Sequence, residues 1–147
     1  MKIDFEVLNH TADIKIRAHG STLEELFTNA LIGMFQSAGP RAVGCRIAND
    51  RLVCPQFPEH HIIEIDAFNA ESLLVDFLSE ALFLSDVQNQ AYLDVTIHEI
   101  TPTHIIAKLH GIQITGFEIA QIKAISYHNL KIKQVPEGFE VEIVFDI

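Results

Sequence analysis

Apolar residues follow a helical spacing in only two stretches of this chain, and much of the remainder alternates between apolar and polar positions. The first stretch contains Leu23, Leu26, Phe27, Ala30, Leu31, Met34 and Phe35, and the second runs from about Asn69 to Asp86. Spacings of three and four place side chains on one helix face, whereas a period of two is typical of a strand with one buried face. The sequence therefore predicts two helices among several strands.

Both predicted helices carry signals at their ends. Ser21 or Thr22 can cap the first helix, acidic residues occupy its first turn, and Gly39-Pro40 ends it. Asn69 can cap the second helix. The apolar side chains of the second helix, from Leu73 to Phe83, cover a wide arc, which predicts burial on most sides.

The alternating segments predict the fold class. Strands are expected at 13–18, 92–100, 103–110, 112–114, 119–133 and 139–147, with turn points at Thr101-Pro102, Gly111 and 136–138. This order predicts an α+β fold in which two main helices pack on a largely antiparallel β-sheet. With 147 residues and 48% hydrophobic residues, the chain is expected to form a single domain over 1–147.

The segment 40–60 contains three prolines and both cysteines. Asn49-Asp50 is turn-like and separates two possible short strands at 45–48 and 52–54, so we expect a hairpin or a loop of mixed order. Cys45 and Cys54 could meet across a hairpin. A reduced pair is nevertheless the default for a cytoplasmic protein, and two thiols alone do not make a zinc site.

The net charge of −10 argues against direct, stable binding to nucleic acid, because phosphate backbones are bound by clustered Lys and Arg. An acidic protein is better suited to the basic surface of a nucleic-acid-binding enzyme, although many cytoplasmic proteins are acidic. The N-terminus lacks the apolar stretch of a signal peptide, and no stretch approaches 18 uninterrupted apolar residues. We expect a cytoplasmic protein that does not enter a membrane.

Two carboxylates occupy matching positions near the two ends of the chain. Asp13 begins one alternating run, and Asp146 almost ends another. If these strands are antiparallel neighbours, Asp13 and Asp146 come within reach of one cation, to which the terminal carboxylate of Ile147 could add an oxygen. Such ligands suit a hard divalent cation, with Ca²⁺ as the first choice and Mg²⁺ or Mn²⁺ as alternatives. Two unrelated surface aspartates would give the same pattern.

Three ionisable side chains bear on this site. Lys15 shares a strand face with Asp13 at about 6.6 Å, so its ammonium would compete with a cation. His10 could orient the loop that presents Asp13, or it could be an ordinary turn residue. Lys123 has the parity of Ile125 rather than a plainly polar face, which is also what a strand lysine extending past apolar neighbours would show.

Motifs for independent catalysis are missing from the sequence. It contains no glycine-rich phosphate loop, no nucleophile elbow and no zinc-protease motif. Five histidines are candidate metal ligands: His60, His61, His98, His104 and His110. Exposed strand positions are favoured for the last three, because no tight His spacing with an acid recurs. A metal-dependent hydrolase built on two carboxylates would lack a His or Cys nucleophile arrangement.

Five segments, in this order along almost the whole chain, resemble the archease family. They are His10-Thr11-Ala12-Asp13-Ile14, 22–27, 73–80, 122–128 and 144–147. The resemblance implies an accessory protein of the RtcB-type, GTP-dependent RNA ligase, which joins RNA ends in tRNA splicing and RNA repair. Archeases promote guanylylation of the active-site histidine of that ligase and its repeated turnover. They are not known to form the RNA bond themselves, so a non-catalytic activator is expected.

The resemblance also implies which residues act. The implied site comprises Asp13, Asp146 and Ile147 for the divalent cation, and Lys123 and His10 for activation of the partner. Archeases often carry a small residue such as glycine at the position of Lys15, and segment 40–60 departs most from their pattern. A second role attached to the family is that of a chaperone-like modulator of an RNA methyltransferase, which is the alternative function.

Overall fold

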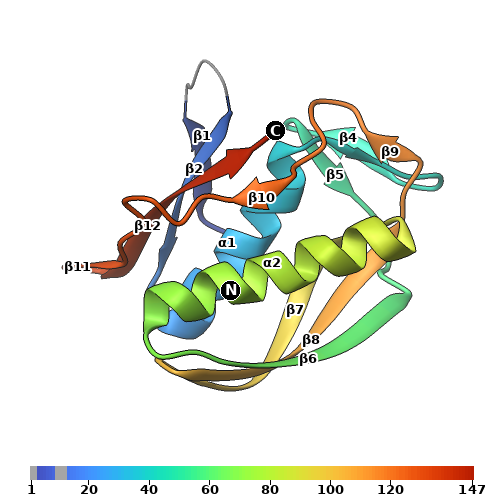
Figure 1. Ribbon diagram of the computed structural model, residues 1–147. Coiled ribbons are helices and arrows are strands. Elements are labelled where there is room, and N and C mark those ends of the chain that lie inside the picture. Colours follow the sequence, from blue (N-terminus) through green and yellow to red (C-terminus); the bar gives the residue numbers. More distant parts are fainter. Residues whose placement is uncertain (1–2, 9–12) are drawn as a thin grey trace.

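The computed structural model describes residues 3–8 and 13–147. Helix α1 spans Leu23–Ser37 and helix α2 spans Ala70–Gln88, each preceded and followed by strands (Figure 1). The strand pairings are antiparallel, so the predicted α+β class with two main helices is confirmed. In the part of the chain that is described, no helix has both the length and the apolar character needed to cross a membrane.

The first and last long strands are neighbours in a five-stranded sheet. Its members are β1 (Phe5–Leu8), β2 (Ile14–Gly20), β12 (Gly138–Asp146), β10 (Ala124–Ile125) and β11 (Lys133–Val135). Strand β2 lies between β1 and β12, while both β10 and β11 pair with β12. The buried residues of β2 and β12 alternate with outward-facing ones, as the sequence predicts for half-buried strands.

A three-stranded sheet forms the other side of the molecule. It has the order β6 (Glu59–Asp66), β8 (His104–Gln113) and β7 (Gln90–Thr101). Two small pairs complete the strands, β3 (Pro40–Arg41) with β9 (Gly116–Phe117) and β4 (Arg46–Ala48) with β5 (Arg51–Val53). Helix α1 contacts β2 of the larger sheet and β7 of this one, and α2 lies across the three-stranded sheet (Figure 1).

The helix ends follow the predicted signals. The Thr22 hydroxyl accepts a hydrogen bond from the backbone of Glu25, and the Asn69 side chain accepts one from Ser72. These contacts satisfy backbone donors that have no partner within the helix. The helices meet through Phe27 and Phe77, whose ring centroids are 5.6 Å apart.

Burial of α2 is less complete than its apolar arc predicts. Leu73, Leu74, Phe77 and Leu78 are fully buried, but Phe83 is 59% exposed. The helix crosses the three-stranded sheet on one side and contacts β10 on another, which leaves a third side in solvent.

The turn predicted at Gly111 is wrong, because β8 runs through this residue without interruption. A Cβ atom at this position would lie 2.3 Å from the carbonyl oxygen of Ala91 and 2.6 Å from Cδ1 of Tyr92. Gly111 therefore permits the close approach of β7. A close approach of another backbone is a common reason for a glycine inside a strand.

The long strand predicted over 119–133 is also wrong. Only β10 and the beginning of β11 are strand, and the rest of the segment is irregular. The buried side chains are Ile122 and Ile125, three residues apart, whereas Lys123 is exposed. Lys123 therefore does not share the environment of Ile125, and the parity argument for it fails.

The expectation of reduced cysteines is not met, since Cys45 and Cys54 form a disulfide. Asn49 and Asp50 have positive φ angles of 53° and 61°, the combination typical of a two-residue hairpin turn. This turn pairs Arg46 with Val53 and so brings the two flanking cysteines together, with 4.5 Å between their Cα atoms. The hairpin predicted for this segment is confirmed, and its register decides the pairing.

His104 lies among three carboxylates on the outer face of the three-stranded sheet. Its Nδ1 atom is 2.6 Å from Asp66, and its Nε2 atom is 3.0 Å from Glu99 and 3.5 Å from Glu64. The hydrogen bond with Asp66 raises the pKa of His104, against a smaller opposing effect of burial, and the charges of the three acids add to the rise.

His104 should make stability depend on pH in a defined direction. A raised pKa in the folded state stabilises the protein below the unfolded value of about 6.5, and this contribution is lost as pH rises through the folded pKa. The unfolding free energy of the wild type, measured against that of His104→Gln, should therefore have a larger advantage at about pH 6 than at higher pH, and this advantage should fall as the pH rises through the folded pKa of His104. A difference that grows with pH would contradict this assignment.

Candidate cation and partner-binding site

Asp13 and Asp146 lie at the same end of the pairing between β2 and β12. In this pairing Ile14 is opposite Phe145, and each aspartate is the next residue beyond that pair. The neighbouring strands that the sequence analysis assumed are therefore present. Alternation with the buried Ile14 and Phe145 places both aspartates on the other face of the sheet, where Asp146 is exposed and Asp13 is half-buried with its Oδ1 atom enclosed.

Lys123 is brought to the same end of the sheet by β10. Ala124 is opposite Asp146 in the register, and the backbone N–H of Lys123 donates a 2.8 Å hydrogen bond to the carbonyl oxygen of Asp146. In Figure 1 the C-terminus follows the end of β12 beside β10. Three segments far apart in the sequence thus converge at Asp13, Lys123 and Asp146, and the side chain of Lys123 remains exposed there.

The side chains at this end of the sheet offer the type of ligand that a hard cation prefers, but they offer few of them. Asp13 and Asp146 offer carboxylate oxygens, the donors that Ca²⁺ and Mg²⁺ prefer. Within residues 3–8 and 13–147, no group of three or more His, Cys, Asp or Glu side chains is placed to hold a metal ion. Ile147 is 44% exposed beside Asp146. A cation here would take its remaining oxygens from water or from a partner molecule, and His10 lies outside the described residues.

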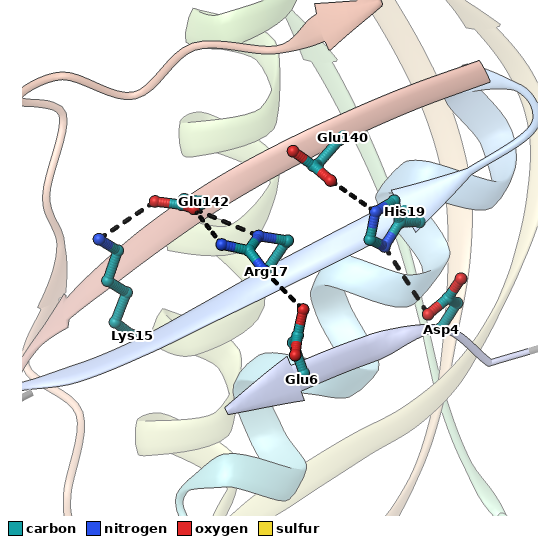
Figure 2. A network of polar contacts seen from close by, with 7 residues as sticks. All are labelled: Asp4, Glu6, Lys15, Arg17, His19, Glu140 and Glu142. Atoms are coloured by element: carbon teal, nitrogen blue, oxygen red, sulfur yellow. Dashed lines mark hydrogen bonds and ion pairs between the residues drawn. The ribbon is translucent and has the colours of Figure 1, made fainter. Parts of the chain in front are cut away.

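Lys15 forms an ion pair away from Asp13, whereas the sequence predicts that its ammonium lies close to a cation at Asp13. Its ammonium is 3.1 Å from Oε1 of Glu142, which lies opposite Arg17 and therefore farther from the end occupied by Asp13 (Figure 2). The hydrogen bonds from Arg17 and then Lys15 lower the pKa of Glu142 and keep it ionised. The ion pair with Glu142 draws the ammonium of Lys15 away from Asp13. The competition of Lys15 for a cation at Asp13 is therefore weaker than the sequence predicts.

The outer face of the five-stranded sheet carries a series of ion pairs that the sequence analysis missed. Arg17 bridges Glu6 on β1 at 2.8 Å and Glu142 on β12 at 2.7 Å (Figure 2). One row along, His19 lies 2.6 Å from Glu140 and 3.7 Å from Asp4. In each row a basic residue of β2 lies between an acid of β12 and an acid in, or just before, β1. Alternating basic residues along β2 were the available signal, but their partners depend on register.

The sheet order and the convergent acids and lysine define a small α+β protein with one polar end. The model of the Archease protein family (MTH1598/TM1083) matches residues 5–147. An archease of Methanosarcina acetivorans is 33% identical over 153 residues, covering 97% of this chain and 95% of the relative. The chain therefore belongs to the archease family.

Two solved structures have the same fold. An archease of Thermotoga maritima, described as a possible chaperone, superposes with a TM-score of 0.61 at 19% identity and covers 95% of this chain and 94% of its own. Protein 1598 of Methanobacterium thermoautotrophicum superposes with a TM-score of 0.65 at 24% identity, covering 97% and 98%. At these identities the likeness shows the fold alone.

Proposed function

We propose that this protein activates an RtcB-type, GTP-dependent RNA ligase, promoting guanylylation of the ligase histidine and repeated turnover in tRNA splicing and RNA repair. Family membership supports this role. The observation that carries the proposal to this chain is the convergence of Asp13, Lys123 and Asp146 at one end of the sheet, where Lys123 and Asp146 are exposed.

Each of these residues has a distinct role in the proposal. Asp13 and Asp146, with the terminal oxygens of Ile147, hold a divalent cation, preferably Ca²⁺, by their carboxylates. Such an ion supplies positive charge for a phosphate or an acidic group. Lys123 offers a compact, exposed ammonium that contacts a phosphate or a carboxylate in the ligase site. His10, which precedes Asp13 in the family motif, is assigned to activation of the partner.

The surface charge favours a protein partner over RNA. A net charge of −10 opposes contact with phosphate backbones and attracts the basic surface that an RNA-binding enzyme presents. The association rate of this protein with the ligase should consequently fall as salt concentration rises, because screening shortens the range of the attraction.

A multiple-turnover joining assay tests the proposal. The ligase is supplied with GTP and an excess of cleaved RNA, with and without this protein. Product should stop near one equivalent of ligase when the protein is absent and continue when it is present. Identical product in the two reactions would remove the proposal. Capture of a purified RNA methyltransferase, without effect on the ligase, would instead favour the chaperone-like role.

Cation binding should be visible as thermal stabilisation. An ion that binds only the folded state raises stability by about 2.7 kcal/mol at a hundredfold excess over Kd. For a domain of this size this corresponds to a rise in Tm of roughly 5–10 °C. Asp13→Ala should abolish the rise with Ca²⁺. Glu137→Ala removes the same charge from an exposed position in the turn before β12 and should retain it. Equal shifts in both variants would contradict a site at Asp13.

A further inference from the structure

Strand β6 is an edge of the three-stranded sheet. In the part of the chain that is described it pairs with β8 alone, and Figure 1 shows it along the lower border of the molecule. An edge strand presents a row of backbone N–H and C=O groups that have no partner within their own sheet. These groups can pair with a strand of another chain.

Every second residue of β6 directs its backbone groups to the free edge. The pairing with β8 is regular over Glu59–Asp66, and just beyond it the N–H of Ala67 donates a 2.9 Å hydrogen bond to the carbonyl oxygen of Thr103. Hydrogen-bonded pairs alternate along an antiparallel ladder. The odd-numbered residues of β6 therefore bond to β8, and the even-numbered residues direct their N–H and C=O groups outward.

The even-numbered residues also carry their side chains on the outer face of the sheet. All four of these side chains are exposed: His60, Ile62, Glu64 and Asp66. Ile62, at the middle of the strand, is 70% exposed although it is large and apolar. An apolar side chain at the centre of an exposed edge promotes pairing between chains.

We propose that β6 pairs with β6 of a second copy of this chain, antiparallel and about a twofold axis at Ile62. The two three-stranded sheets then join edge to edge. In this register Ile62 lies opposite Ile62 of the second copy, and His60 lies opposite Glu64 of the second copy, twice by symmetry. All of these residues direct their backbone outward, so each opposed pair exchanges two hydrogen bonds.

Side-chain chemistry selects this register among those that the backbone allows. Only even-numbered residues can lie opposite one another, because their partners must also direct N–H and C=O groups to the edge. A register centred on Glu64 would oppose two carboxylates, which is destabilising. Registers centred on His61 or Ile63 would oppose Ile62 to a polar side chain. The register centred on Ile62 opposes apolar to apolar and imidazole to carboxylate.

His60 and Glu64 have contacts within the chain that leave them available to a second copy. The Nδ1 atom of His60 lies 2.7 Å from Nδ1 of His110, which leaves the Nε2 atom for a carboxylate. Glu64 is 3.5 Å from His104, the longest of the three carboxylate contacts of that ring. His104 therefore keeps its two shorter contacts when Glu64 turns toward the second copy.

The dimer should be weak. Its interface is a single pair of strands, and small interfaces are typical of transient complexes. Each copy also carries a net charge of −10, so the two copies repel each other. We expect a Kd of about 0.1 mM at about 0.15 M salt.

Sedimentation velocity of the purified protein alone, over about 0.01–1 mM and at about 0.15 M salt, tests the proposal. The wild type should pass from monomer to dimer within this range. Ile62→Glu should raise Kd at least about tenfold, because the new carboxylate faces its own copy across the axis. Within its own chain this position lies opposite Lys108, so the fold should be retained. Val87→Glu adds the same charge at an exposed apolar position of α2 and should dimerise like the wild type.

An exchange of charges tests the register. His60→Glu alone opposes two carboxylates and should weaken the dimer. Adding Glu64→Lys to this variant should restore association, because each new carboxylate then faces a new ammonium. A wild type that remains monomeric at about 1 mM would overturn the proposal. So would a dimer that is unaffected by Ile62→Glu, equally weakened by Val87→Glu, or not restored by the charge exchange. The ligase is absent from these measurements, so their failure is distinguishable from failure of the joining assay.

Discussion

Asp146→Ala should remove most of the stimulation of the ligase while leaving the protein folded. The side chain of Asp146 is exposed at the end of β12, whereas its backbone carbonyl accepts the hydrogen bond from Lys123 and remains in the variant. Exposed positions of this kind usually change stability by about 0.5 kcal/mol or less. We therefore expect a fall of at least about tenfold in stimulated turnover, equivalent to about 1.4 kcal/mol, with Tm in metal-free buffer almost unchanged.

Lys123→Ala separates the two roles assigned to this end of the sheet. It should reduce stimulation like Asp146→Ala, but it should retain stabilisation by Ca²⁺, because Lys123 is assigned to the partner rather than to the cation. Glu137→Ala serves as the charge control in the joining assay. Wild-type stimulation by the Asp146→Ala protein would exclude this carboxylate from the interaction with the ligase.

Gly111→Ala should be strongly destabilising, although it adds a single methyl group. The new Cβ atom would lie 2.3 Å from the backbone oxygen of Ala91, so β7 or the central strand β8 must move. Overpacking of a core costs about 1–3 kcal/mol and occasionally more, and a contact with backbone cannot be relieved by a side-chain rotation. We expect a loss of about 3 kcal/mol in urea unfolding, a large part of the ~5–15 kcal/mol typical of a domain.

Lys108→Ala is the control for this substitution. Lys108 lies on the same strand, but on its outward face. A surface change of this kind should alter the unfolding free energy by no more than about 0.5 kcal/mol. Equal stability of Gly111→Ala and Lys108→Ala would show that β7 can withdraw from β8 without cost.

The candidate cation site and the cross-strand polar contacts depend on residues far apart in the chain. Arg17 and Glu142 are 125 positions apart, and His60 and His110 are 50 apart. Strand register decides both pairs, because a shift by one residue would reverse the faces of the strands. Sequence alone identified Asp13 and Asp146 as possible neighbours only because both lie at ends of strands whose alternation was clear.

The two helices, a cap at Ser21 or Thr22 for the first and at Asn69 for the second, and the long strands near the two ends of the chain were all predictable from local sequence. Those features depend on local hydrogen bonding and on which face is buried, and both leave a periodic pattern. Contacts between distant segments place Gly111 inside a strand, leave Lys123 exposed beside Asp146, and pair Lys15 with Glu142. Such outcomes follow from which strands become neighbours and in what register, and the packing of the whole chain decides both.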